Sequence, residues 1–166
     1  MSNHLIIGLG GTGGKVIRSI RKAIYRDWRQ PISSESKPAA GLDKVTAATP
    51  PDIKIDYLYV DSSNEHMSFD DESWKVLGEN LQLDPASQLE LKGTNIATIF
   101  EDLDSYKHIA PWIGNKRDWA SVLNIGASGQ KVLGGQKRRL GRLLLAMHAH
   151  DLMAKLSSKV KALRER

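Results

Sequence analysis

The chain of 166 residues contains no cysteine and no long hydrophobic run. The absence of cysteine excludes disulfide bonds and thiolate metal ligands, and it is typical of a reducing compartment. The longest apolar runs, such as Leu143 to Met147, fall far below the roughly 18 residues that a membrane span requires. No segment resembles a secretory signal. We therefore expect a cytoplasmic protein without a membrane span.

The composition limits the size of the fold and the kind of partner. With 40% hydrophobic residues, the chain can bury a core as one domain or as half of a larger one. The net charge of +5 is uneven, because residues 131–166 hold ten basic and two acidic side chains, a balance of +8, and residues 1–130 carry −3. We interpret the basic segment as a solvated helix face or as a surface covered by further sequence, rather than as a nucleic-acid interface.

The N-terminal segment His4 to Gly14 is a short apolar strand that runs into a turn with five glycines. From Lys15 to about Trp28, apolar residues recur with helical spacing. Glycines let the backbone approach a ligand, and the first amides of a helix attract an anion. Strand, turn and helix together predict a phosphate cradle for a nucleotide. Its candidate residues are Gly8, Gly10, Gly11, Thr12, Gly13, Gly14 and Lys15.

The turn also satisfies the GxGxxG pattern of dinucleotide-binding folds, between Gly8 and Gly13. In those folds an acidic residue that binds ribose follows about 20 residues later, whereas here the corresponding Asp61 comes much further on. The turn is not a P-loop, because Val16 follows Lys15 where that motif has serine or threonine.

A second strand is predicted at Ile53 to Val60, where β-branched and aromatic residues dominate. The segment 30–52 before it is rich in proline, serine, alanine and glycine and predicts a long loop. Small polar residues at the carboxyl end of a strand mark the edge where open α/β sheets bind ligands. Asp61, Ser62 and Ser63 are therefore candidate nucleotide-binding residues.

The middle of the chain gives weaker signals. Gln88 to Leu91 is a candidate short strand, and Thr94 is a candidate cap for a helix reaching Leu103. The step Ala110-Pro111-Trp112 breaks this helical pattern. We interpret three tryptophans as packing residues rather than as base-stacking platforms: Trp74, Trp112 and Trp119.

A second glycine-rich loop spans Ile125 to Gly135, and a helix is expected from about Gln136 to Ser157. Arg138 and Arg139 at the start of this helix are candidates for binding phosphate. Gly134 and Gly135 complete the candidate site.

We predict neither catalytic nor metal-binding residues within this chain. His148 and His150 are two positions apart, so on a helix they point about 200° apart and cannot share a metal. The remaining histidines are isolated and form no triad.

Three of these segments resemble the N-terminal half of the tubulin/FtsZ superfamily, and most closely the bacterial tubulin-like proteins. The similarity covers roughly residues 4–30, 53–66 and 125–150. It rests on the first glycine turn, on the strand that ends Val60-Asp61-Ser62-Ser63, and on Gly134-Gly135-Gln136 leading into Leu140-Gly141-Arg142.

The resemblance implies an α/β fold with a Rossmann-like parallel sheet and flanking helices, binding GTP or GDP, with Mg²⁺ as a candidate companion ion. It also implies self-association, because such proteins hydrolyse GTP with acidic residues from a neighbouring subunit. The family's GGGTGSG-type loop and acidic catalytic loop do not occur here, so we expect residues 1–166 to form an incomplete nucleotide-binding domain without efficient turnover of its own. Lys15 stands where the family usually has an asparagine.

Two alternatives remain open at this point. One is a Rossmann domain that binds NAD or FAD for an oxidoreductase, with Asp61 on the ribose. The other is a non-enzymatic interaction module that uses its basic C-terminal helix. The second glycine loop favours the tubulin-like interpretation, because a simple NAD fold does not need it.

Overall fold

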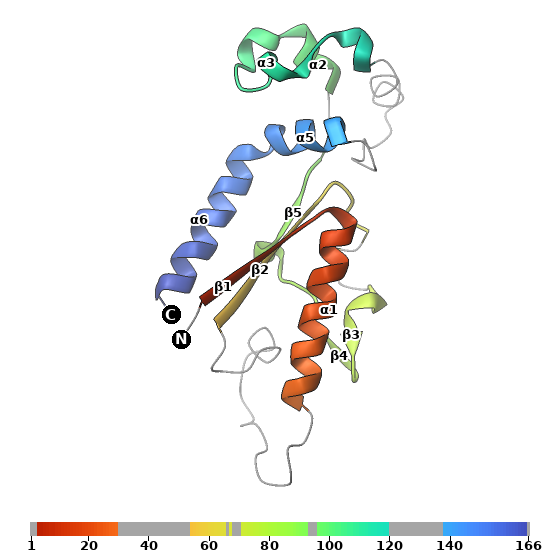
Figure 1. The fold of residues 1–166 in the computed structure, drawn as a ribbon, viewed down its shortest axis with the longest axis vertical. Helices are drawn as coiled ribbons and strands as arrows, with labels where there is room; N and C mark the ends of the chain where they lie inside the picture. The colour runs from red at the N-terminus through yellow and green to blue at the C-terminus, as the bar shows by residue number, and fades with distance from the viewer. Residues whose placement is uncertain are drawn as a thin grey trace.

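The protein contains a parallel sheet of three strands flanked by helices (Figure 1). The computed structural model describes residues 3–29, 54–65, 67, 71–92, 96–119 and 138–165. The sheet order is β1-β2-β5, with β1 at Asn3–Leu9, β2 at Lys54–Asp61 and β5 at Gln88–Glu90. The α/β class and the three expected strands are confirmed. The predicted loop 30–52, Thr94 and the glycine-rich segment 125–135 lie outside the described residues.

The central strand β2 separates two cores because its side chains alternate between the faces of the sheet. Tyr57 and Tyr59 are buried on one face, and Leu58 and Val60 are buried on the other. Strands β1 and β2 pair in parallel from Asn3 opposite Lys54 to Leu9 opposite Val60, so they end at the same edge of the sheet. A strand buried on both faces explains the nearly continuous apolar and aromatic run that predicted it.

Helix α1 (Gly10–Arg29) covers the tyrosine face of the sheet, where Ile17 packs against Tyr57 and Tyr59. The expected start of this helix at Lys15 was wrong, because the helix begins five residues earlier. Gly10 has a left-handed φ of +66° that turns the chain out of β1, and the glycines after it already belong to the helix. The glycine turn and the helix N-terminus are therefore one feature.

A small hairpin packs beside α1. It consists of β3 (Lys75–Val76) and β4 (Glu79–Asn80) and follows the short helix η2 (Glu72–Trp74). The buried guanidinium of Arg21 donates from Nε to the carbonyl of Leu81 at 2.8 Å. Burial lowers the pKa of Arg21.

The opposite core collects the short helices of the middle region around Leu58 and Val60. These helices are α2 (Ile96–Glu101), η4 (Leu103–Ser105), α3 (Ala110–Ile113) and η5 (Lys116–Trp119). The helical pattern of α2 does not continue through Ala110-Pro111-Trp112, as predicted, but this step also begins a new helix, α3, because proline is tolerated in the first turn of a helix. Leu103 falls outside α2.

The interpretation of the three tryptophans as packing residues is confirmed. Trp74 and Trp119 are buried, and Trp112 packs against the second core. The indole of Trp119 donates to the carbonyl of Ile113 at 2.9 Å.

The expected C-terminal helix is two helices, α5 (Arg138–Met147) and α6 (Ala149–Glu165), so the prediction of one helix ending near Ser157 was wrong. The chain bends at His148, whose Nε2 lies 3.0 Å from the carbonyl oxygen of Lys92. Figure 1 shows the two helices running in different directions. Helix α5 buries Leu140, Leu143 and Leu144 in the second core, whereas α6 lies along the sheet. The spacing of apolar residues in the sequence predicts a helix, but it does not show that the first part packs in the second core and the second part on the sheet.

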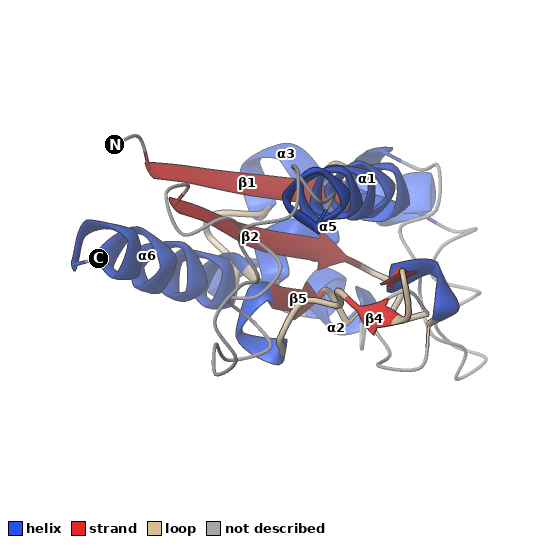
Figure 2. Cartoon of the chain, turned by 90° about the horizontal axis from the view of Figure 1, so that it is seen from below, coloured by secondary structure: helices blue, strands red, loops and turns tan. Residues whose placement is uncertain are grey.

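Helix α6 is attached to the face of the sheet opposite α1 (Figure 2). The ammonium of Lys159 lies 2.8 Å from a carboxylate oxygen of Asp56, and both side chains are mostly buried. Asn3 donates from its amide to the carbonyl of Leu163 at 2.6 Å, which joins the two ends of the described chain. Lys155 of α6 likewise donates to the carbonyl of Pro85 at 3.1 Å, so Lys155 and Lys159, two basic residues of the C-terminal segment, contact the protein itself.

Candidate nucleotide-binding site

The glycine turn packs β1 directly against the start of α1. A Cβ atom added to Gly13 would lie 2.6 Å from the carbonyl carbon of Gly8, and one added to Gly8 would lie 2.7 Å from the carbonyl oxygen of Gly13. A Cβ atom on Gly14 would lie 2.5 Å from the ring of Tyr59. These three glycines are required for close packing of strand, helix and Tyr59.

The middle of the turn has the opposite environment. A Cβ atom on Gly10 or Gly11 would meet no atom within 4 Å among the described residues. Gly11 and Thr12 are exposed at the first turn of α1, where backbone N–H groups have no partner within the helix. This turn contains no acidic side chain, and the exposed Lys15 follows it. The space and the positive helix end fit a phosphate group.

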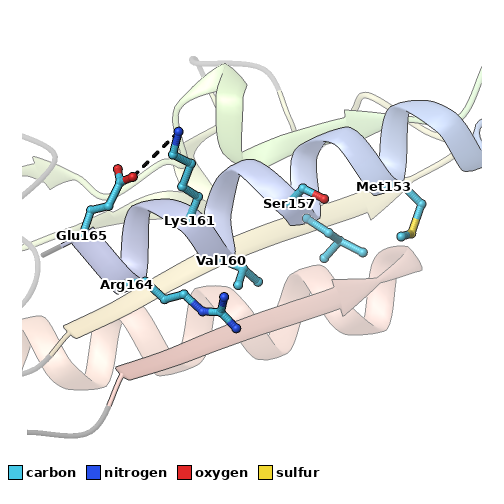
Figure 3. Close-up of a pocket in the computed structure, with 7 residues that line it drawn as sticks. Met153, Ser157, Val160, Lys161, Arg164 and Glu165 are labelled. Carbon is cyan, nitrogen blue, oxygen red and sulfur yellow. Dashed lines mark ion pairs between the residues drawn. The ribbon is translucent and has the colours of Figure 1, made fainter.

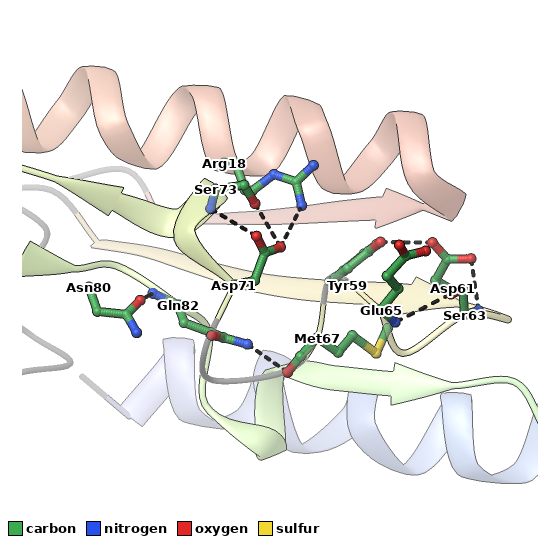
Figure 4. A network of polar contacts seen from close by, with 10 residues as sticks. All are labelled: Arg18, Tyr59, Asp61, Ser63, Glu65, Met67, Asp71, Ser73, Asn80 and Gln82. Carbon is green, nitrogen blue, oxygen red and sulfur yellow. Dashed lines mark hydrogen bonds and ion pairs between the residues drawn. The ribbon is translucent and has the colours of Figure 1, made fainter.

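The carboxyl end of β2 lies beside this turn. The register pairs Leu9, the last residue of β1, with Val60, so the start of α1 at Gly10 and the last residue of β2, Asp61, follow at the same edge of the sheet. Figure 4 shows the Asp61 side chain at this edge, with Tyr59 pointing toward it. One carboxylate oxygen of Asp61 accepts hydrogen bonds from the backbone N–H groups of Ser62, at 2.7 Å, and Ser63, at 3.3 Å. The predicted residues of the turn and of the strand end are thus brought together.

Sequence reasoning missed Tyr59, which joins these two parts of the site. Its hydroxyl donates to the second carboxylate oxygen of Asp61 at 2.7 Å. Burial strongly raises the pKa of Tyr59, and the hydrogen bond to Asp61 raises it further, so the hydroxyl stays neutral and keeps its proton. The signal was present in the sequence, because residues two apart on a strand share a face.

The predicted arginines are held differently. Arg138 and Arg139 are exposed at the start of α5. The Arg139 guanidinium donates to the carbonyl of Ile113 at 3.1 Å and lies 5.2 Å from the ring centre of Trp119. Arg139 therefore connects α5 with α3 and η5 through these two contacts. Gly134 and Gly135 lie outside the described residues.

Nothing in the described part of the chain gathers three or more histidine, aspartate or glutamate side chains into a metal site. Both ring nitrogens of His148 face other groups: Nδ1 lies 3.3 Å from a carboxylate oxygen of Asp151, and Nε2 lies 3.0 Å from the carbonyl oxygen of Lys92. The helices of the described residues include none that is both long and apolar enough to cross a membrane.

The fold and the glycine turn define a class of protein: α/β domains whose first parallel strand leads through a glycine turn directly into the N-terminus of a helix. A comparison with protein-family models matches the tubulin-like family over residues 5–166. The chain belongs to this tubulin-like family, and its predicted membership of the tubulin/FtsZ superfamily is confirmed. Comparisons with curated proteins and with solved structures give no match.

Proposed function

We propose that this tubulin-like protein binds guanine nucleotide, GTP or GDP, with the phosphates at the N-terminus of α1. The observation that carries the proposal is the space that the described residues leave open at Gly10 and Gly11, where the first turn of the helix lies beside the end of β2. Phosphate oxygens placed there accept hydrogen bonds from the helix N–H groups and experience the positive helix end.

Neighbouring groups support the same ligand. Lys15 adds a positive charge one turn along α1, and Thr12 adds a hydroxyl at the exposed end of the helix. The Asp61 carboxylate lies at the sheet edge, where it can accept a ligand hydroxyl or approach a Mg²⁺ ion bound to the phosphates. Arg139 would have to leave the Ile113 carbonyl to reach a phosphate, so Arg138 is the better of the two arginine candidates.

Isothermal titration calorimetry with GTP, GDP and NAD, each with Mg²⁺, tests the ligand. We expect the 166-residue chain to bind GTP and GDP at least about tenfold more tightly than NAD, a difference of ~1.4 kcal/mol. ATP serves as the control for recognition of the base. Tighter binding of NAD would overturn the proposal and favour the dinucleotide-binding alternative.

We also propose that the protein associates with copies of itself, which its family membership supports. Within the described residues, β1 is an edge strand that pairs with β2 alone, and its Ile7 and Leu9 side chains are exposed. A groove of about 520 Å³ runs beside Met153 and Val160 of α6. Figure 3 shows the α6 side chains of this groove above β1 and β2. Free strand edges with exposed apolar side chains favour pairing between molecules.

Sedimentation velocity with GTP present tests self-association over a range of protein concentrations. We expect the parent chain to form larger species as its concentration rises, and the Met153→Lys/Val160→Lys variant to remain smaller, because the added charges oppose burial. Leu77→Lys is the matched control, since Leu77 is an exposed apolar side chain on the hairpin. A parent chain that stays monomeric, or a double variant that associates like the parent, would contradict the proposal.

A further inference from the structure

Tyr59 is placed to connect the glycine turn with the end of β2. It belongs to the central strand and is fully buried on the face covered by α1. Its ring fills the space beside Gly14, where any added Cβ atom would clash with it. The position of the tyrosine ring and the position of the first helical turns are therefore mutually dependent.

The Tyr59 hydroxyl fixes the direction of a carboxylate at the candidate site. It donates to one oxygen of Asp61 at 2.7 Å, and the Ser62 and Ser63 amides donate to the other oxygen at 2.7 and 3.3 Å. Donors on both oxygens define the plane of the carboxylate (Figure 4). The side chain of Asp61 is only partly buried, so this oriented group still reaches the sheet edge.

The neighbouring tyrosine on the same face shows that burial alone does not produce this contact. Tyr57 lies two residues earlier on β2 and is also buried, but its hydroxyl has no hydrogen-bond partner among the residues that the structure describes. The guanidinium carbon of Arg21 lies over the Tyr57 ring, 4.9 Å from the ring centre. Tyr57 therefore packs, whereas Tyr59 both packs and orients a carboxylate.

We propose that Tyr59 is a positioning residue of the nucleotide site, which holds the Asp61 carboxylate in the orientation that a bound nucleotide uses. This inference rests on the proposed function. Without the hydroxyl, the Asp61 carboxylate keeps its two amide donors but loses the contact that fixes its second oxygen. The free energy of nucleotide binding must then also cover the cost of ordering this carboxylate, so the affinity falls.

A double-mutant cycle on GTP affinity tests this role in the 166-residue chain. Tyr59→Phe keeps the ring against Gly14 and removes only the hydroxyl, and we expect it to weaken GTP binding roughly three- to tenfold. Tyr57→Phe is the matched control and should leave the affinity unchanged within about twofold. In the Asp61→Ala background, Tyr59→Phe should have no further effect, because the two residues act through one contact.

Thermal unfolding of each variant shows whether it is folded before affinities are compared. Equal GTP affinity for Tyr59→Phe and Tyr57→Phe would overturn the positioning role while leaving the proposed function intact. An undiminished effect of Tyr59→Phe in the Asp61→Ala background would also overturn it, because the hydroxyl would then act through the general fold. If the parent chain binds no GTP, the proposed function fails, and this inference fails with it.

Discussion

Replacing Gly11 by valine is expected to weaken GTP binding about 10- to 100-fold without destabilising the fold. The valine side chain would occupy the open space at the first turn of α1, where we place the phosphates. Hydrogen bonds to a charged ligand contribute about 1.5–3 kcal/mol each, so displacing the phosphate from even one amide gives a loss of this size. Calorimetry with GTP measures the change.

The fold should tolerate this substitution because Gly11 does not have a left-handed φ and a side chain there meets no atom within 4 Å among the described residues. Glycine within a helix also costs about 0.5–1 kcal/mol relative to alanine, so a substitution need not lower stability. Circular dichroism and thermal unfolding check that the variant resembles the parent. If a folded Gly11→Val variant bound GTP as tightly as the parent, the phosphates could not bind at this turn.

Replacing Gly13 by alanine is expected to have the opposite outcome and to destabilise the whole domain. The new Cβ atom would lie 2.6 and 2.8 Å from the carbonyl carbon and Cα of Gly8. Backbone atoms cannot rotate away as a flexible side chain can, so α1 must move away from β1. We expect a loss near or above the upper end of the ~1–3 kcal/mol typical of overpacking, measured as the free energy of unfolding in urea.

Gly141→Ala is the control for this substitution. Gly141 lies inside α5, and a Cβ atom there meets nothing within 4 Å in the described part of the chain. The alanine should stabilise α5 by about 0.5–1 kcal/mol, because it restricts the unfolded backbone. If Gly13→Ala were as stable as the parent, the close contact between Gly8 and Gly13 would not be a requirement of the fold.

The contrast between Gly11 and Gly13 bears on how a glycine motif is interpreted. From the sequence alone, every glycine of the turn was predicted to bind the nucleotide. The structure gives Gly8, Gly13 and Gly14 a packing role and Gly10 a left-handed backbone, and the residues that it describes leave space at Gly11. The motif identifies a strand that turns into a helix, but the position of each glycine in three dimensions decides whether its missing side chain makes room for protein or for ligand.

The sequence predicted the secondary-structure elements whose residue types and spacing favour one conformation. The β-branched and aromatic residues of β2 indicated a strand, and the spacing of apolar residues indicated α1. The start of α1 was misplaced because glycines have low helix propensity, which tertiary packing against β1 overrides here. The bend at His148 was missed because both α5 and α6 are amphipathic, and periodicity does not report which surface each helix covers.

The candidate site divides in the same way. By itself, the sequence determined the parallel α/β class, the glycine turn at the start of the first helix, and the polar residues at the end of the second strand. Only the tertiary structure decided that Leu9 and Val60 lie side by side at the ends of β1 and β2, that the Tyr59 hydroxyl donates to Asp61, and that Arg139 contacts the Ile113 carbonyl. The reason is physical: residue types and their spacing set local conformation, whereas strand register and core packing set the distances between residues far apart in the chain.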